Sequence, residues 1–160
     1  MGFNHFDDHG RAVMVDVSGK DPTMRVAIAG ATVIMKPGTV KMILEGKAAK
    51  GDVLAVARLA GIAAAKRTPE LIPLSHTLAL LAVSVDFDTD PDAGRIFVKA
   101  SVKAIDRTGV EMEAMTAASV AALTVYDMCK GADRGMTITE VALLFKEGGK
   151  SGTYRKEGPG

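Results

Sequence analysis

The chain has 160 residues, 20 of them basic and 19 acidic, and its formal net charge is +1. The balanced charge and an aromatic content of 4% give no support for binding to nucleic acid or to membranes. Cys129 is the single cysteine, which excludes an intrachain disulfide and favours a reducing, cytoplasmic compartment. No signal peptide or apolar run of about 20 residues is recognisable. We therefore expect a single domain over residues 1–160, with mobile tails at about 1–10 and 147–160.

The first third of the chain predicts two strands and then two helices. Valines alternate with other residues over Arg11–Val17, and Arg25–Met35 is rich in valine, isoleucine and threonine; both patterns are typical of strands. Thr39–Glu45 carries apolar side chains at helical spacing, and its first residue is a suitable N-cap. A longer helix with one apolar face is predicted over Asp52–Arg67.

Glycine and proline mark the features that follow. Gly61 lies inside the predicted long helix, where glycine costs about 1 kcal/mol relative to alanine, so we expect close packing at this position. Pro69 and Pro73 fall within Thr68–Thr77 and argue against a regular helix or a central strand there. Because the segment is mostly apolar, we expect a packed loop.

The second half of the chain predicts a hairpin, a central helix and a last strand. Two strands, Leu78–Asp88 and Arg95–Asp106, are joined by a turn at 90–94. Gly109–Gly131 is rich in helix-forming residues and is bracketed by glycines, and Met136–Lys146 predicts the last strand. This order of elements is typical of an α+β fold, in which helices pack on one face of an antiparallel sheet.

The charges of the predicted central helix lie at its two ends. Its middle is apolar nearly all round, so we expect it to be buried. Glu111 and Glu113 suit the positive N-terminal end of the helix dipole, whereas Asp127 opposes the negative C-terminal end. Asp127 and Lys130 are three residues apart on one face, so a simple ion pair and a functional site are both open interpretations.

Other polar residues also leave two interpretations open. His76 in the apolar segment is either a hydrogen-bonded core residue or an acid–base group. Lys50 precedes a helix N-terminus, which attracts phosphate, but a glycine linker with Asp52 as N-cap explains the same pattern. His5 and His9 lie far from His76 in the sequence, so no protein-held metal is predicted. The pattern suits an acid–base enzyme acting on a phosphorylated ligand or a regulatory module that binds a small molecule.

Seven segments occur along the chain in this order: Met14–Ser18, Lys50–Val53, Ala60–Thr68, Leu71–His76, Thr108–Ala114, Tyr126–Lys130 and Gly148–Gly152. Together they closely resemble the cyclic pyranopterin monophosphate synthase family of molybdenum-cofactor biosynthesis, over nearly the whole chain. Where the family commonly has Leu-Cys-His-Pro, this chain has Leu-Ser-His-Thr from residue 74 to residue 77. Ser75 still donates a hydrogen bond, and the absence of proline at Thr77 loosens the loop.

The resemblance implies a ferredoxin-like α+β fold and a lyase reaction. The implied substrate is a cyclic dihydro-GTP, in which the ribose is already bonded to the guanine. The enzyme would open the five-membered ring of the purine, rebuild it as a pyranopterin and close a cyclic phosphate with release of pyrophosphate. These steps are proton transfers, additions and a phosphoryl displacement, so no cofactor is expected.

The resemblance also implies roles for individual residues. Asp127 is expected to be the principal catalytic residue, as an acid–base group or as the group that orients Lys130. Lys50 and Lys130 are expected to be general acid–base groups or ligands of the triphosphate. A carboxylate at Glu113 suits the N–H groups derived from guanine. The residues expected to bind substrate are Leu74, Ser75, His76, Met112, Glu113, Glu111, Lys146 and Lys150.

The spacing of two carboxylates predicts an oligomer. Glu113 and Asp127 are 14 residues apart, which corresponds to roughly 21 Å along a helix and to directions that differ by about 40°. A guanine nucleotide is shorter than this span, so one chain does not bring both carboxylates to one substrate by this helix. Two antiparallel helices related by a two-fold axis would do so. We therefore expect a homo-oligomer with shared sites, and the resemblance implies a hexamer built as a trimer of dimers.

Two other classes of function remain open at this point. A ferredoxin-like regulatory domain would bind a guanine nucleotide without chemistry, and it would not require Asp127 or Lys50. A structural subunit would bind no guanine nucleotide. Release of pyrophosphate from the cyclic dihydro-GTP separates the enzyme from both.

Overall fold

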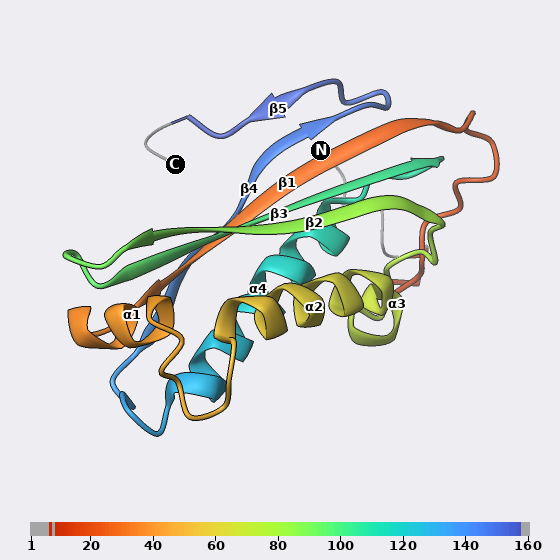
Figure 1. The fold of residues 1–160 in the computed structure, drawn as a ribbon. Coiled ribbons are helices and arrows are strands. Elements are labelled where there is room, and N and C mark those ends of the chain that lie inside the picture. Colours follow the sequence, from red (N-terminus) through yellow and green to blue (C-terminus); the bar gives the residue numbers. More distant parts are fainter. Residues whose placement is uncertain (1–6, 8, 158–160) are drawn as a thin grey trace.

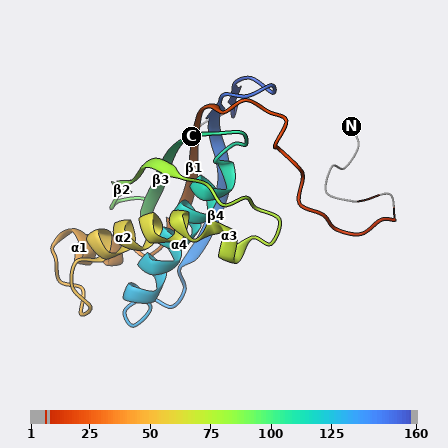
Figure 2. The same cartoon turned by 90° about the vertical axis from the view of Figure 1, so that its right-hand side faces the viewer.

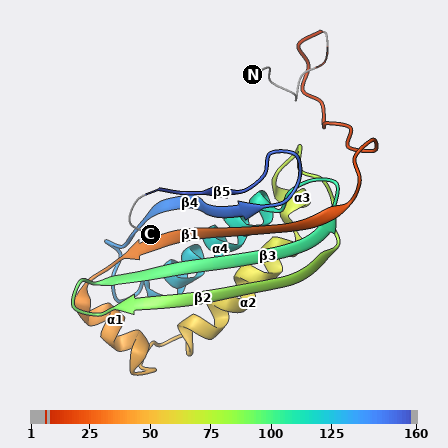
Figure 3. The same cartoon turned by 90° about the horizontal axis from the view of Figure 1, so that it is seen from above.

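A five-stranded antiparallel sheet with helices on one face forms the framework of the structure (Figure 1). The computed structural model describes residue 7 and residues 9–157. The strands lie in the order β2-β3-β1-β4-β5, which Figure 3 shows from above. The elements are β1 (Thr23–Ile34), α1 (Pro37–Leu44), α2 (Val53–Lys66), α3 (Thr68–Leu71), β2 (Leu80–Asp90), β3 (Arg95–Asp106), α4 (Glu111–Cys129), β4 (Thr137–Glu147) and β5 (Tyr154–Arg155). This arrangement confirms the predicted α+β fold.

The core lies between the sheet and helices α2 and α4. Strand β1 pairs with β3 without a register shift, from Thr23 opposite Asp106 to Ile34 opposite Arg95. Over residues 27–33 of β1 and 96–104 of β3, every second residue faces the helices and is fully buried, which is the alternation expected of a sheet covered on one face. These buried residues are Ala27, Ala29, Ala31, Val33, Ile96, Val98, Ala100, Val102 and Ala104. The many alanines are small, and they allow α4 to lie close to the sheet.

Gly61 allows the two long helices to approach each other. A Cβ atom at this position would lie 2.9 Å from the carbonyl oxygen of Ala117 and 3.2 Å from Cβ of Ala121 on α4. These distances are too short for a carbon atom in a packed core, so only glycine fits without a shift. The close packing predicted for Gly61 is therefore confirmed.

Most of the predicted elements agree with the structure. The strands predicted at 25–35, 78–88, 95–106 and 136–146 correspond to β1, β2, β3 and β4. The helices predicted at 39–45, 52–67 and 109–131 correspond to α1, α2 and α4, and no end of these seven elements differs by more than two residues. Asp52 is the N-cap of α2, where its carboxylate accepts a hydrogen bond from the backbone N–H of Ala55. The short strand β5 was not predicted.

The strand predicted over Arg11–Val17 is wrong. A single bridge at Ala12 is the only strand-like pairing in this segment. Figure 2 shows that the chain before β1 runs away from the sheet. Val13 and Met14 are 42% and 49% exposed. A strand needs a neighbour for its N–H and C=O groups, and the alternation of valines does not supply one.

Two predictions about local helix geometry are also corrected. The segment predicted as a loop without a helix contains α3, a single turn with Pro69 in its first positions. Proline is tolerated there because the first N–H groups of a helix have no partner within the helix. Thr39 is not the N-cap of α1: Lys36 holds that position, and the hydroxyl of Thr39 donates to the carboxylate of Asp133 at 3.3 Å.

Helix α4 is not buried all round in a single chain. One side packs on the sheet and on α2, but Leu123 on another side is 57% exposed. No helix within the described residues is long and apolar enough to cross a membrane. Of the predicted mobile tails, residues 1–6, 8 and 158–160 lie outside the described residues, and β5 pairs with β4 within the C-terminal one.

Candidate active site

Two cavities meet at the N-terminal end of α4. The larger has a volume of about 720 Å³ and the smaller about 380 Å³. Both are lined by Lys20, from the segment before β1, by Thr108 and Gly109, from the connection between β3 and α4, and by Glu111, the first residue of α4. Because the shared residues form a common border, the two cavities are neighbouring compartments of one pocket. Their volumes fall in the range of known small-molecule sites, roughly 300–1,000 Å³.

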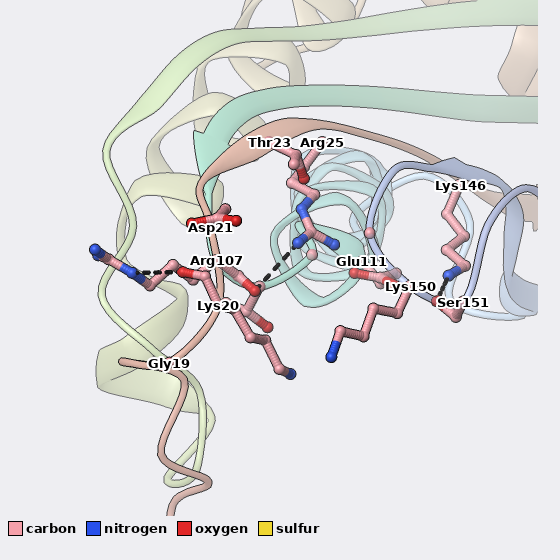
Figure 4. Close-up of a pocket in the computed structure, with 13 residues that line it drawn as sticks. Gly19, Lys20, Asp21, Thr23, Arg25, Arg107, Glu111, Lys146, Lys150 and Ser151 are labelled. Carbon is pink, nitrogen blue, oxygen red and sulfur yellow. Dashed lines mark hydrogen bonds between the residues drawn. The ribbon is translucent and has the colours of Figure 1, made fainter.

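The larger cavity is strongly basic (Figure 4). The side chains of Lys20, from the segment before β1, and Lys150, from the turn after β4, extend toward one another in this view. Lys146 near the end of β4 donates a hydrogen bond to the hydroxyl of Ser151. Arg107 points away from the two lysines, and its Nε donates to the carbonyl of Lys20 at 2.9 Å. The cavity therefore gathers cations from several separate parts of the chain.

Arg25 lies at the base of this cavity and is 9% exposed. Its Nε and Nη2 atoms donate to the carbonyls of Asp106 and Arg107, each at 3.1 Å. Lys20, Arg25 and Arg107 were not among the predicted site residues. A signal for Arg25 was present in the sequence, because it falls in the alternating series that continues as the buried alanines of β1. A charged residue on the buried face of a strand needs a partner or a function.

The smaller cavity contains the buried carboxylate of Glu113. The residue is 2% exposed, and burial is the main cause that raises the pKa of its carboxyl group, with a further rise from Glu111. Ser75 and His76, from the loop after α3, oppose this rise. Nε2 of His76 lies 2.8 Å from the carbonyl of Val15, so this nitrogen donates and holds the N-terminal segment beside the cavity. The cavity thus offers a buried carboxylate together with an ordered imidazole.

A third group of charges lies at the other end of α4. The carboxylate of Asp127 contacts Nζ of Lys130 at 2.6 Å and Nζ of Lys50 at 2.8 Å. Lys50 also donates to the backbone carbonyl of Asp127 at 3.2 Å, across 77 residues of sequence. Hydrogen bonds from Lys130 and Lys50 lower the pKa of Asp127 to about 2. All three side chains are about half exposed, so these ion pairs contribute little to stability.

The structure divides the predicted site residues between the two ends of α4. The smaller cavity is lined by Leu74, Ser75, His76, Glu111, Met112 and Glu113, and the larger by Glu111, Lys146 and Lys150. Asp127, Lys50 and Lys130 line neither cavity. Glu113 and Asp127 are 14 residues apart on one helix, roughly 21 Å along its axis. Within one chain, the pocket and the cluster of Asp127, Lys50 and Lys130 therefore lie at opposite ends of α4.

The chain is similar to proteins of one known family over most of its length. The MoaC family model matches residues 14–149. The cyclic pyranopterin monophosphate synthase of Geobacter metallireducens is 69% identical over 99% of both chains, and that of Geobacter sulfurreducens is 67% identical over 98% of both. Cyclic pyranopterin monophosphate synthase 1 of Mycobacterium bovis is 57% identical over 98% of this chain and 91% of its own. The chain therefore belongs to the MoaC family.

Proposed function

We propose that this chain is a lyase of molybdenum-cofactor biosynthesis. It converts a cyclic dihydro-GTP into cyclic pyranopterin monophosphate and releases pyrophosphate. The observation that carries the proposal is the pocket of two compartments, one basic and one with a buried carboxylate, in a chain of the MoaC family. The residues from the N-terminal segment to the turn after β4 contribute to the pocket, so we treat the chain as one catalytic domain.

The basic compartment suits the triphosphate of the substrate. Arg25 is buried and fixed, whereas Lys20 and Lys150 are exposed and able to adjust to the phosphates. Guanidinium and ammonium groups form charge-assisted hydrogen bonds with phosphate oxygens. The triphosphate would therefore lie in the larger cavity, with the ring system extending past Glu111 into the smaller one.

The smaller compartment suits the guanine-derived rings. Guanine presents adjacent N–H donors, and a carboxylate accepts two such hydrogen bonds at once. Glu113 supplies this carboxylate at a buried position, where the hydrogen bonds are little weakened by water. Met112 and Leu74 provide apolar contacts at the same cavity.

The cluster of Asp127, Lys50 and Lys130 supplies the acid–base groups. With a pKa of about 2, Asp127 is a carboxylate at neutral pH and has no proton to donate. Its role in the free enzyme is therefore to orient the two ammonium groups. A positioned lysine donates a proton to a developing anion during ring opening or phosphoryl displacement, and then takes one back.

We further propose that two subunits share each active site. An antiparallel arrangement of two α4 helices would place Asp127 of one chain at the pocket of the other. Exposed apolar side chains on the two long helices that cover the sheet support an interface on the helical side: Leu59 of α2 is 68% exposed and Leu123 of α4 is 57% exposed. Three such dimers would form the hexamer that the family resemblance implies. We propose the cytoplasm as the compartment of this assembly.

A turnover experiment tests the proposed reaction. The purified protein is mixed with the cyclic dihydro-GTP, and pyrophosphate and the pterin product are measured together. We expect both products in equal amounts. Binding of the substrate without pyrophosphate would favour the regulatory domain, and absence of binding would favour the structural subunit.

A further inference from the structure

The turn that follows β4 packs directly against the buried guanidinium of Arg25. Gly148 and Gly149 have φ angles of 102° and 75°, which side chains rarely allow. A Cβ atom on Gly149 would overlap Nη1 of Arg25 and would lie 2.8 Å from its Cζ. A Cβ atom on Gly148 would overlap the carbonyl oxygen of Met24. The turn therefore reaches its position only because two consecutive residues have no side chain.

Hydrogen bonds hold the guanidinium of Arg25 in its position beside this turn. On its other side, Nε and Nη2 donate to the carbonyls of Asp106 and Arg107. Both acceptors are neutral, and Arg25 takes part in none of the ion pairs found among residues 7 and 9–157. A buried guanidinium without a carboxylate, at the base of an open cavity, is ready to bind an anion.

The same turn carries other groups of the basic compartment. Lys150 follows Gly149 directly, and Ser151 accepts the hydrogen bond from Lys146 (Figure 4). The distance between the turn and Arg25 therefore also sets the distance between Arg25 and Lys150. The side chain of Lys150 can adjust, but it reaches a phosphate group on Arg25 only if its backbone is held at the right distance from the guanidinium.

We propose that Gly149 is a positioning residue that holds Arg25 and Lys150 at the spacing needed to bind phosphate between them. This inference rests on the triphosphate site of the proposed function. A Cβ atom at residue 149 would push the guanidinium off its carbonyl acceptors or move the turn with Lys150 outward. Either change would weaken phosphate binding without removing any charge.

Gly152 provides a matched control within the same turn. Its φ angle is 65°, so alanine there meets the same kind of backbone strain, but a Cβ atom would meet no other atom within 4 Å. Gly149→Ala and Gly152→Ala are compared by the calorimetric affinity for inorganic tripolyphosphate, by KM and kcat, and by melting temperature. We expect Gly149→Ala to weaken tripolyphosphate binding and raise KM by about 10-fold or more, as for the loss of a charge-assisted hydrogen bond. We expect kcat and the Gly152→Ala affinities to stay within about two-fold of the wild type.

A second pair of variants tests whether the effect passes through Arg25. Arg25→Lys keeps the positive charge but removes the group that a Cβ at residue 149 would overlap. Adding Gly149→Ala to Arg25→Lys should change tripolyphosphate affinity by less than about two-fold, because the contact is already gone. An equal loss in both backgrounds, or equal affinities in the two glycine variants, would overturn the inference. Affinity that depends on Gly149 in a protein without turnover would support the inference and reject the proposed reaction.

Discussion

The two ends of α4 carry carboxylates in opposite environments. Glu113 at the N-terminal end is 2% exposed, and burial raises the pKa of its side chain. Asp127 at the C-terminal end is exposed, and two lysines lower its pKa to about 2. The environment of each carboxylate, rather than its residue type, therefore determines its role. The buried carboxylate is an acceptor for a ligand, and the exposed one is a fixed anion that orients ammonium groups.

The largest effect is expected from Asp127→Asn. Asparagine keeps the size of the side chain but loses the charge that holds Lys50 and Lys130 at 2.8 and 2.6 Å. Loss of acid–base function typically lowers the rate by about 100- to 10,000-fold, and we expect kcat to fall within this range. The melting temperature should change little, because the ion pairs are exposed.

Asp86→Asn on β2 is the control for this variant, since Asp86 is an exposed aspartate away from both cavities. It should retain the wild-type rate. Asp127→Asn with a near-normal rate and an intact fold would remove the lysine–aspartate cluster from the mechanism.

Lys50→Ala should have a smaller effect, because Lys130 remains paired with Asp127. We expect kcat to fall by about 100-fold, and the loss should be the same at low and high salt if Lys50 transfers a proton. Lys47→Ala is the control, since Lys47 lies in the same connection and is also ion-paired, with Glu45 at 2.8 Å. A loss that appears in KM and shrinks at high salt would instead identify Lys50 as a phosphate ligand.

Glu113→Gln should raise KM by roughly 10- to 100-fold, because glutamine offers the ligand one acceptor in place of a carboxylate. Its effect on stability should depend on pH. The pKa of Glu113 is raised from 4.5 in the folded state, so its favourable contribution is complete below that value and is lost as pH rises through the folded pKa. Glutamine stays neutral, so the melting temperature of the variant relative to the wild type should rise as the pH increases above 4.5.

Glu70→Gln on α3 controls for the removal of a surface charge, since Glu70 is exposed. Its melting temperature relative to the wild type should vary little over the same range of pH. If the difference in melting temperature between Glu113→Gln and the wild type did not depend on pH, ionisation of the buried carboxylate would not destabilise the folded state.

The sequence predicts the fold well wherever the apolar period reports a buried face. In β3 the alternation of Val98, Ala100 and Val102 with the polar residues at 99, 101 and 103 matches the observed burial, and the strand boundaries agree. The same alternation fails over Arg11–Val17, because a period shows which residues share a face but not whether a neighbouring strand exists. The prediction that residues 68–77 contain no helix also failed. Pro69 lies in the first turn of α3, where proline is compatible with a helix.

The site was predictable only where its residues are close in sequence or lie in the family motifs. Asp127 and Lys130 are three residues apart, so spacing alone indicated their ion pair. Lys50 reaches the same carboxylate across 77 residues, and no local pattern contains that contact. The alternation in β1 signals that Arg25 is buried, but not that it lines the basic cavity with Lys20. That placement depends on how β1 and the segment before it pass the turn after β4, which only the complete fold determines.

The central claim is that each active site combines the N-terminal end of α4 from one subunit with the C-terminal end of α4 from another. Complementation tests it most directly. Chains with Glu113→Ala are mixed with chains with Asp127→Ala, each inactive alone, and exchange of subunits is verified with differently tagged chains. We predict that activity returns after exchange, because hybrid dimers contain one site in which both residues are wild type. Verified exchange without any recovery of activity, or an active monomer, would contradict the shared site.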